Sequence, residues 1–210
     1  MTCSCDYGKT VPWDEFLPYI LPNMGDVPDA IAAHAARLAT IELAQVSYEI
    51  KATLVMDAFG GVPHYDLNTD DGYTVLLIDY VDLCGCEYTA NRQTYGFGRC
   101  RQYTFDRPEE RIILNPAPTC TTPRGLEIRA VVAPSQDSCF VPASVYERHA
   151  ETIANGAMMR LYKMRAASWF DVGLAREYER LWRDSLRWIR VHSLKGGSTA
   201  GLALKAKRVV

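Results

Sequence analysis

Two cysteine pairs are the first candidates for chemistry in this sequence. Cys3 and Cys5 form one C-x-C pair, and Cys84 and Cys86 form another. Structural zinc sites generally use pairs of cysteines with two to four residues between them, whereas only one residue separates the cysteines of each pair here, and no second pair with the zinc spacing follows either of them. We therefore expect no bound metal. The seven cysteines are an odd number and the opening residues lack the apolar core of a secretory signal, so we expect free thiols in a reducing compartment.

Two other stretches resemble catalytic or metal sites without completing them. "DLNTDDG" (66–72) begins like an EF-hand calcium loop, but Asp71 stands where the loop needs glycine and Leu77 where it needs glutamate. A turn is the better interpretation. His64 and Asp66 share one face of an expected strand and could form a base with its orienting acid, but no nucleophile motif accompanies them. We expect no enzyme activity and no cofactor.

One charge pattern stands out from the rest of the chain. Five arginines follow one another at intervals of 4, 3, 4 and 3, which places them on one face of a helix: Arg176, Arg180, Arg183, Arg187 and Arg190. Glu177, Glu179 and Asp184 flank them. Three interpretations stay open: a solvated face with internal ion pairs, contact with an acidic neighbouring subunit, and contact with DNA phosphates.

Composition places limits on the partners. The 210 residues are 48% hydrophobic, with a formal net charge of −2 and a pI near 6.1. This balance gives no overall electrostatic reason to bind nucleic acid or a membrane surface. No apolar run is long enough to span a bilayer, so we expect no membrane partner.

The pattern of elements predicts an α+β fold. We expect an N-terminal arm (1–25) that packs in extended form on the core or on a partner, a helix capped by Asp26 (26–45), a mostly antiparallel β subdomain (46–134), two helices (135–192) and an extended tail (193–210). The regions 26–45 and 135–192 would form a helical bundle in which the β subdomain is inserted. In the last helix the expected apolar face comprises Leu174, Tyr178, Leu181, Ser185 and Ile189, with Trp182 and Trp188 on its flanks.

A glycine interrupts the first of the two later helices. In "IANGAMMRLYKM", Gly156 lies in a helix interior, where glycine costs about 0.5–1 kcal/mol relative to alanine. Close packing of another backbone explains such a residue. We expect Gly156 and Ala157 to meet the alanine-rich helix at 26–45.

Three stretches, in this order, resemble the adaptor or head-to-tail connector proteins of tailed bacteriophages, including the tail tubular protein A group of short-tailed phages. They are "FLPYILPNMGDVPDAIAAHAARLATIELAQVSYEI", "YDLNTDDGYTVLLIDYVDLCGCEY" and "LEIRAVVAPSQDSCFVPASVYERHAETIANGAMMRLYKMRAASWFDVGLAREYERLW". The chain departs from the usual pattern at Val46–Glu49, where that family has aromatic and basic residues, and at its C-x-C pairs.

The resemblance implies a structural protein of the virion neck. Such proteins are assembled in the host cytoplasm into a homo-oligomeric ring, usually of twelve copies, beneath the portal protein. The ring extends the channel through which genome DNA passes and offers a platform to a downstream tail or nozzle protein. C-terminal tails of the family commonly engage the portal.

The tail of this chain has residues suited to such a contact. It combines apolar anchors with unopposed positive charge, and the candidates are Lys195, Leu202, Leu204, Lys205, Lys207 and Arg208. Two alternatives remain. The arginines and the tail could form a nucleic-acid-binding module, or the cysteines and His64–Asp66 could belong to a small metal-dependent enzyme.

Overall fold

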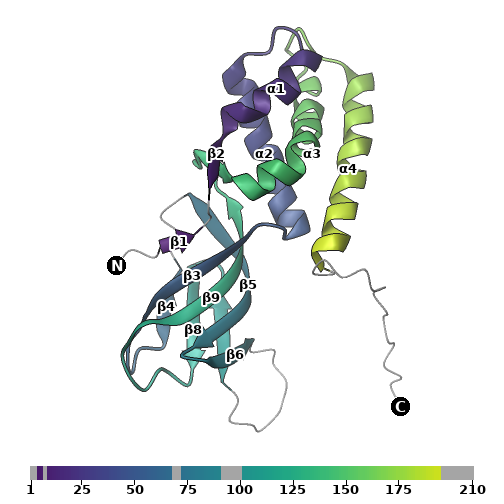
Figure 1. The fold of residues 1–210 in the computed structure, drawn as a ribbon. Helices are drawn as coiled ribbons and strands as arrows, with labels where there is room; N and C mark the ends of the chain where they lie inside the picture. The colour runs from purple at the N-terminus through teal and green to yellow at the C-terminus, as the bar shows by residue number, and fades with distance from the viewer. Residues whose placement is uncertain (1–3, 7–8, 68–71, 91–100, 195–210) are drawn as a thin grey trace, which may run out of the picture.

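The computed structural model is an α+β protein and describes residues 4–6, 9–67, 72–90 and 101–194. The longer helices gather at one end and the main sheet at the other (Figure 1). The helical segments are η1 (Trp13–Phe16), α1 (Leu17–Ile20), η2 (Leu21–Asn23), α2 (Asp29–Ser47), α3 (Ala143–Tyr162) and α4 (Val172–Leu194). The strands are β1 (Ser4–Asp6), β2 (Thr10–Pro12), β3 (Lys51–Ala58), β4 (His64–Asp66), β5 (Tyr73–Leu83), β6 (Cys86–Ala90), β7 (Gln102–Asp106), β8 (Arg111–Asn115), β9 (Thr122–Pro134) and β10 (Phe140–Pro142).

The main sheet is mixed rather than purely antiparallel. Its strand order is β1-β3-β9-β5-β6-β7-β8-β4, and the pairing of β6 with β7 is parallel whereas its other pairings are antiparallel. The long strands β3 and β9 lie side by side, with Lys51 opposite Val131. Buried side chains on β5, such as Val75, Ile78 and Val81, do not keep a strict alternation because the register shifts twice along that strand.

The N-terminal segment packs on the core, but not as the extended arm expected from its prolines. Residues 13–23 form short helical turns, which bury Trp13, Phe16 and Ile20. The Trp13 indole Nε1 donates a 2.8 Å hydrogen bond to the buried carbonyl oxygen of Ser138. Strand β2 pairs with β10 in a separate two-stranded sheet, and β1 joins the edge of the main sheet.

Helix α2 begins and ends later than its sequence suggested. Pro28, not Asp26, occupies the N-cap position, and the helix continues to Ser47 instead of yielding to a strand at Val46. The Ser47 hydroxyl donates to the carbonyl oxygen of Leu43, which satisfies a buried polar group within the helix. Tyr48 then closes the helix in the left-handed conformation, with φ of 57°.

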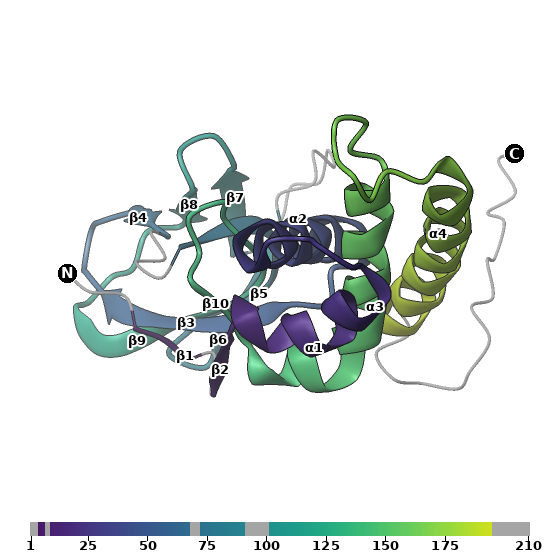
Figure 2. The ribbon, with the colours of Figure 1, turned by 90° about the horizontal axis from the view of Figure 1, so that it is seen from above.

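The three long helices contact one another, and α3 lies between α1 and α4 in both views (Figures 1 and 2). The buried face of α4 differs from the expected one: it is made of Ala175, Trp182, Leu186 and Ile189. The expected core residues Leu174 and Leu181 are 37% and 36% exposed. Within the described ranges, no helix combines the length and the apolar character needed to cross a bilayer.

Candidate interaction surface on helix α4

Gly156 fixes how closely α4 can approach the rest of the helices. A Cβ atom added at Gly156 would lie 2.9 Å from Cε3 and Cζ3 of Trp182 and 3.0 Å from Cβ of Ala39. Real Cβ contacts are essentially never this short, so the missing side chain is what admits the indole of α4 and the alanine of α2 together. The expected neighbour, the alanine-rich helix, is present through Ala39. The indole, which the sequence placed on a flank of α4, makes the closer contacts.

An ion pair beside this glycine ties α2 to α3. Arg160 of α3 reaches Glu42 of α2, and its other terminal nitrogen donates a 2.9 Å hydrogen bond to the carbonyl oxygen of Gly156. Arg160 is mostly buried, with 22% of its side chain exposed. These contacts account for Glu42, an acid beside the apolar stripe of its helix.

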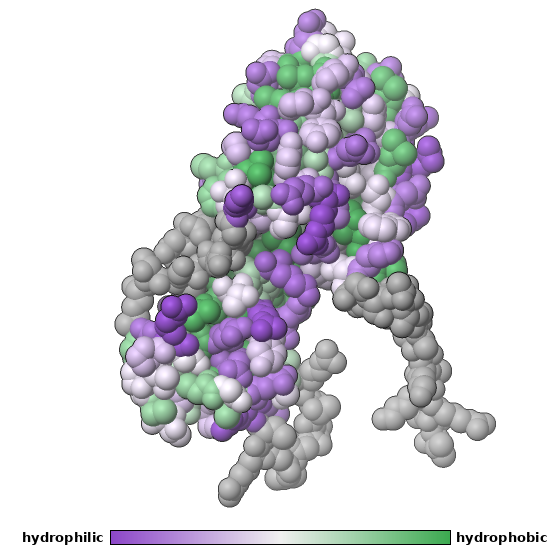
Figure 3. Space-filling model, viewed as in Figure 1, coloured by the Kyte–Doolittle hydropathy of each residue, from purple (hydrophilic) through white to green (hydrophobic). Residues whose placement is uncertain are grey.

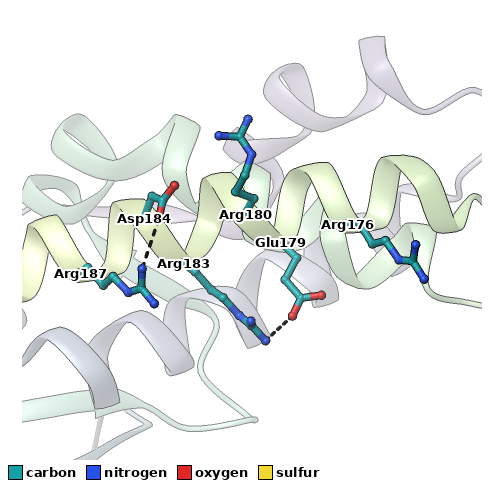
Figure 4. A pocket seen from close by; sticks show the side chains of 6 residues that line it. All are labelled: Arg176, Glu179, Arg180, Arg183, Asp184 and Arg187. Carbon is teal, nitrogen blue, oxygen red and sulfur yellow. Dashed lines mark ion pairs between the residues drawn. The ribbon is translucent and has the colours of Figure 1, made fainter.

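With its buried face packed inward, α4 presents the five arginines to solvent. We call Arg176, Arg180, Arg183, Arg187 and Arg190 the arginine row, and all five are exposed. Four of them, with Glu179 and Asp184, border a shallow hollow of about 400 Å³ (Figure 4). All six side chains come from one helix, so the hollow is a space between long side chains on a surface and not an enclosed pocket.

Acids on or near α4 neutralise part of the arginine row. Glu179 pairs with Arg183 and, at 2.9 Å, with Lys163 at the end of α3; Asp184 lies 3.6 Å from Arg187. The hydrogen bond from Lys163, followed by the charges of Lys163 and Arg183, lowers the pKa of Glu179 below its ordinary value despite an opposing effect of burial. In the part of the chain that the structure describes, no acid pairs with Arg176, Arg180 or Arg190.

A second exposed row lies on the opposite flank of the buried face. Leu174, Leu181 and Trp188 are seven residues apart, which keeps them on one side of a helix with 3.6 residues per turn. We call these three residues the apolar row. Trp188 is 60% exposed, and its ring stacks on that of His192 with centroids 3.8 Å apart. Apolar side chains alternate with hydrophilic ones along the edge of the molecule where α4 lies (Figure 3).

A further cluster of charged groups joins the helices to the sheet. Glu49, between α2 and β3, accepts a 3.0 Å hydrogen bond from Arg148 and lies 3.8 Å from Nε2 of the buried His149. Interaction with His149 first, and with Arg148 next, holds the pKa of Glu49 below its ordinary value. Nothing in the sequence singled out this cluster, because about 100 residues separate its members.

His64 and Asp66 share one exposed face of β4, as expected, but the candidate metal residues form no cluster among the described residues. Asp66 pairs at 2.8 Å with Arg111 of β8, and both His64 and Asp66 are exposed. Cys84 lies in the two-residue turn between β5 and β6, Cys86 begins β6, and both are free thiols. Among the described residues, no three His, Cys, Asp or Glu side chains come close enough to hold a metal ion. Cys3 and the side chain of Cys5 lie outside the described part of the chain.

The expected portal-binding residues cannot be placed. The residues concerned, Lys195, Leu202, Leu204, Lys205, Lys207 and Arg208, all lie outside the described residues.

Comparisons with known proteins found no match among protein-family models and none among curated proteins.

Proposed function

We propose that this chain is a ring-forming adaptor of a tailed-phage virion. In this role it would dock under the portal, extend the DNA exit channel and carry the next tail component. The sequence resemblance over three ordered stretches suggests this family, and the exposed surface of α4 supports a structural role of this kind. The 23-residue helix α4 carries both the apolar row and the arginine row on its solvent side. Exposed apolar side chains gathered on one element are typical of a protein that binds a partner.

The proposal includes a helical bundle that holds the inserted β subdomain, and an extended tail. Helices α2, α3 and α4 would form the ring wall, and the tail after residue 193 would reach the portal. A ring of twelve copies multiplies each weak tail contact, because binding of one tail raises the effective concentration of the others.

The test is a binding experiment with the portal ring of the same phage. We expect the purified chain to sediment as a monomer or weakly associated species alone, and as a ring on the portal. A variant that lacks residues 195–210 should lose portal attachment and keep its melting temperature within about 2 °C. This corresponds to a change below roughly 1 kcal/mol. A stable dimer that does not bind the portal would contradict the adaptor role.

A nucleic-acid-binding module is the second candidate. The observation that favours it is the absence of acid partners at Arg176, Arg180 and Arg190 among the described residues. It predicts that the isolated chain binds duplex DNA with an affinity that falls steeply with salt, by roughly one power of the salt concentration for each phosphate neutralised. If Arg176→Ala, Arg180→Ala and Arg190→Ala together leave that slope unchanged, this candidate fails.

A further inference from the structure

The apolar row of α4 is exposed to solvent, although the buried face of the same helix packs against the rest of the protein. Ala175, Trp182, Leu186 and Ile189 already pack inward, yet Leu174, Leu181 and Trp188 remain 37%, 36% and 60% exposed. The row runs about 21 Å along the helix, from the rise of 1.5 Å per residue. Met164, Phe170, Val172 and Val191 add to the exposed apolar side chains of the same region. Exposed apolar surface concentrated in this way marks an interaction site.

The N-terminal segment differs from α4 in its charge. The N-terminal segment (9–31) contains four exposed acids and one lysine: Asp14, Glu15, Asp26, Asp29 and Lys9. Tyr19 and Ile31 of the same segment are 37% and 36% exposed. Helix α4 has five arginines against three acids. Helix α3 lies between α1, which belongs to this segment, and α4 (Figure 2).

We propose that α4 of one copy docks against the N-terminal segment (9–31) of the next copy. The inference rests on the proposed ring and names the two surfaces that close it. The apolar row would cover Tyr19 and Ile31, and the arginine row would lie toward the exposed acids. Trp188 is suited to anchor the contact, because large aromatic side chains dominate the binding energy of interfaces.

A second copy fits this surface better than a foreign partner does. Each chain carries both halves of the contact, on different elements and with opposite excess charge. Such a head-to-tail arrangement generates a ring when the rotation between copies closes. A symmetric dimer would instead bring the arginine rows of two α4 helices toward each other, and like charges would oppose it.

Photo-cross-linking tests the contact directly. The photoreactive residue p-benzoylphenylalanine replaces Leu181 in a mixture of ¹⁴N- and ¹⁵N-labelled full-length chains, with and without portal rings. We expect mixed-isotope cross-links from position 181 to peptides within residues 9–31. The matched control places the probe at Leu77, which is equally exposed, at 36%, but lies on β5. It should give no such cross-link.

Substitutions provide a second, independent measurement. Leu174→Ser, Leu181→Ser and Trp188→Ser together should raise the dissociation constant between copies by about tenfold or more, as loss of an interface anchor does. Val62→Ser with Leu77→Ser, two exposed apolar residues away from α4, should leave it unchanged. Circular dichroism of each variant establishes that it is folded.

The outcomes separate this inference from the proposed function. The docking surface would be overturned, even if the chain binds the portal, by any of four results. In these results position 181 cross-links to the portal, only within its own chain, to another region of a second copy, or to nothing. Cross-links to residues 9–31 of a second copy in a chain that ignores the portal would support the docking surface and refute the adaptor role.

Discussion

Gly156 of α3 and Trp182 of α4 are in such close contact that no methyl group fits between them. A Cβ at position 156 would fall 2.9 Å from the indole ring. An indole packed between neighbouring helices has no room to swing away, in contrast to the tip of a flexible side chain. The contact therefore sets the distance between the two helices.

Gly156→Ala should destabilise the protein although alanine is the better helix former. The gain in helix propensity is up to about 1 kcal/mol, whereas overpacking costs about 1–3 kcal/mol. We expect a net loss of about 1 kcal/mol in the free energy of unfolding, measured by urea titration. Gly25→Ala is the control, since a Cβ there meets nothing within 4 Å. A melting temperature higher than that of the wild type would contradict the packing role of Gly156.

Glu49→Gln should make stability less dependent on acid. The lowered pKa of Glu49 in the folded protein, caused first by His149 and then by Arg148, means that its ionised form is favoured by folding. This contribution is fully present above the ordinary glutamate pKa of 4.5 and is lost as the pH falls through the lowered value. We expect the variant to be less stable than wild type near about pH 6, with the difference shrinking as the pH falls below 4.5 through the lowered pKa. Glu151→Gln, at an exposed position of α3, should show no such trend.

Trp13→Phe should reveal how firmly the N-terminal segment is attached. Phenylalanine keeps most of the apolar contact but cannot donate to the Ser138 carbonyl oxygen, which the indole now reaches at 2.8 Å. A buried acceptor left without its donor costs about 1–3 kcal/mol. The free energy of unfolding should fall by that amount, while Trp188→Phe, at a 60% exposed position, should change it little. Equal effects at the two positions would contradict this account.

Glu42 and Arg160 should be energetically coupled. A double-mutant cycle with Glu42→Gln and Arg160→Met isolates their interaction from other effects of each substitution. Because 40% of the Glu42 side chain is exposed, solvent weakens the pair, and we expect a coupling of about 0.5–1 kcal/mol. The pair Arg187 and Asp184, which is far more exposed at 79% and 59%, should give less than half of that value. A coupling near zero for Glu42 and Arg160 would mean that α2 and α3 do not depend on this contact.

The sequence predicted the α+β class and the position of the arginine row, because both follow from local patterns. On α4 it predicted Ile189 correctly but was wrong about Leu174 and Leu181, since these leucines satisfy helical spacing as well as Trp182 and Leu186 do. The space beside Gly156, more than twenty residues away in sequence, accommodates the inward-facing Trp182. The end of α2 was missed because the β-branched Val46 favours a strand locally, whereas the helix continues to Ser47, whose hydroxyl bonds back to Leu43.

The ion pairs of Glu49 and Glu179 could not be predicted from sequence patterns for another reason. Glu49 and Arg148 come from distant segments, and so do Lys163 and Glu179, which meet only because α3 and α4 pack side by side. The parallel direction of the β6–β7 pairing is likewise not encoded by the alternation of apolar residues.

The pairing of β3 with β9 has a consequence for how such a protein can be altered. The chain enters the sheet at Lys51 and leaves it past Val131, and these two residues are direct neighbours across the ladder. Paired residues of this kind have Cα atoms about 4.5–5.5 Å apart. A loop, a hairpin or a foreign module could therefore be grafted between these two points without changing the span from α2 to α3. Only the part of β9 that packs against α2 would have to be kept.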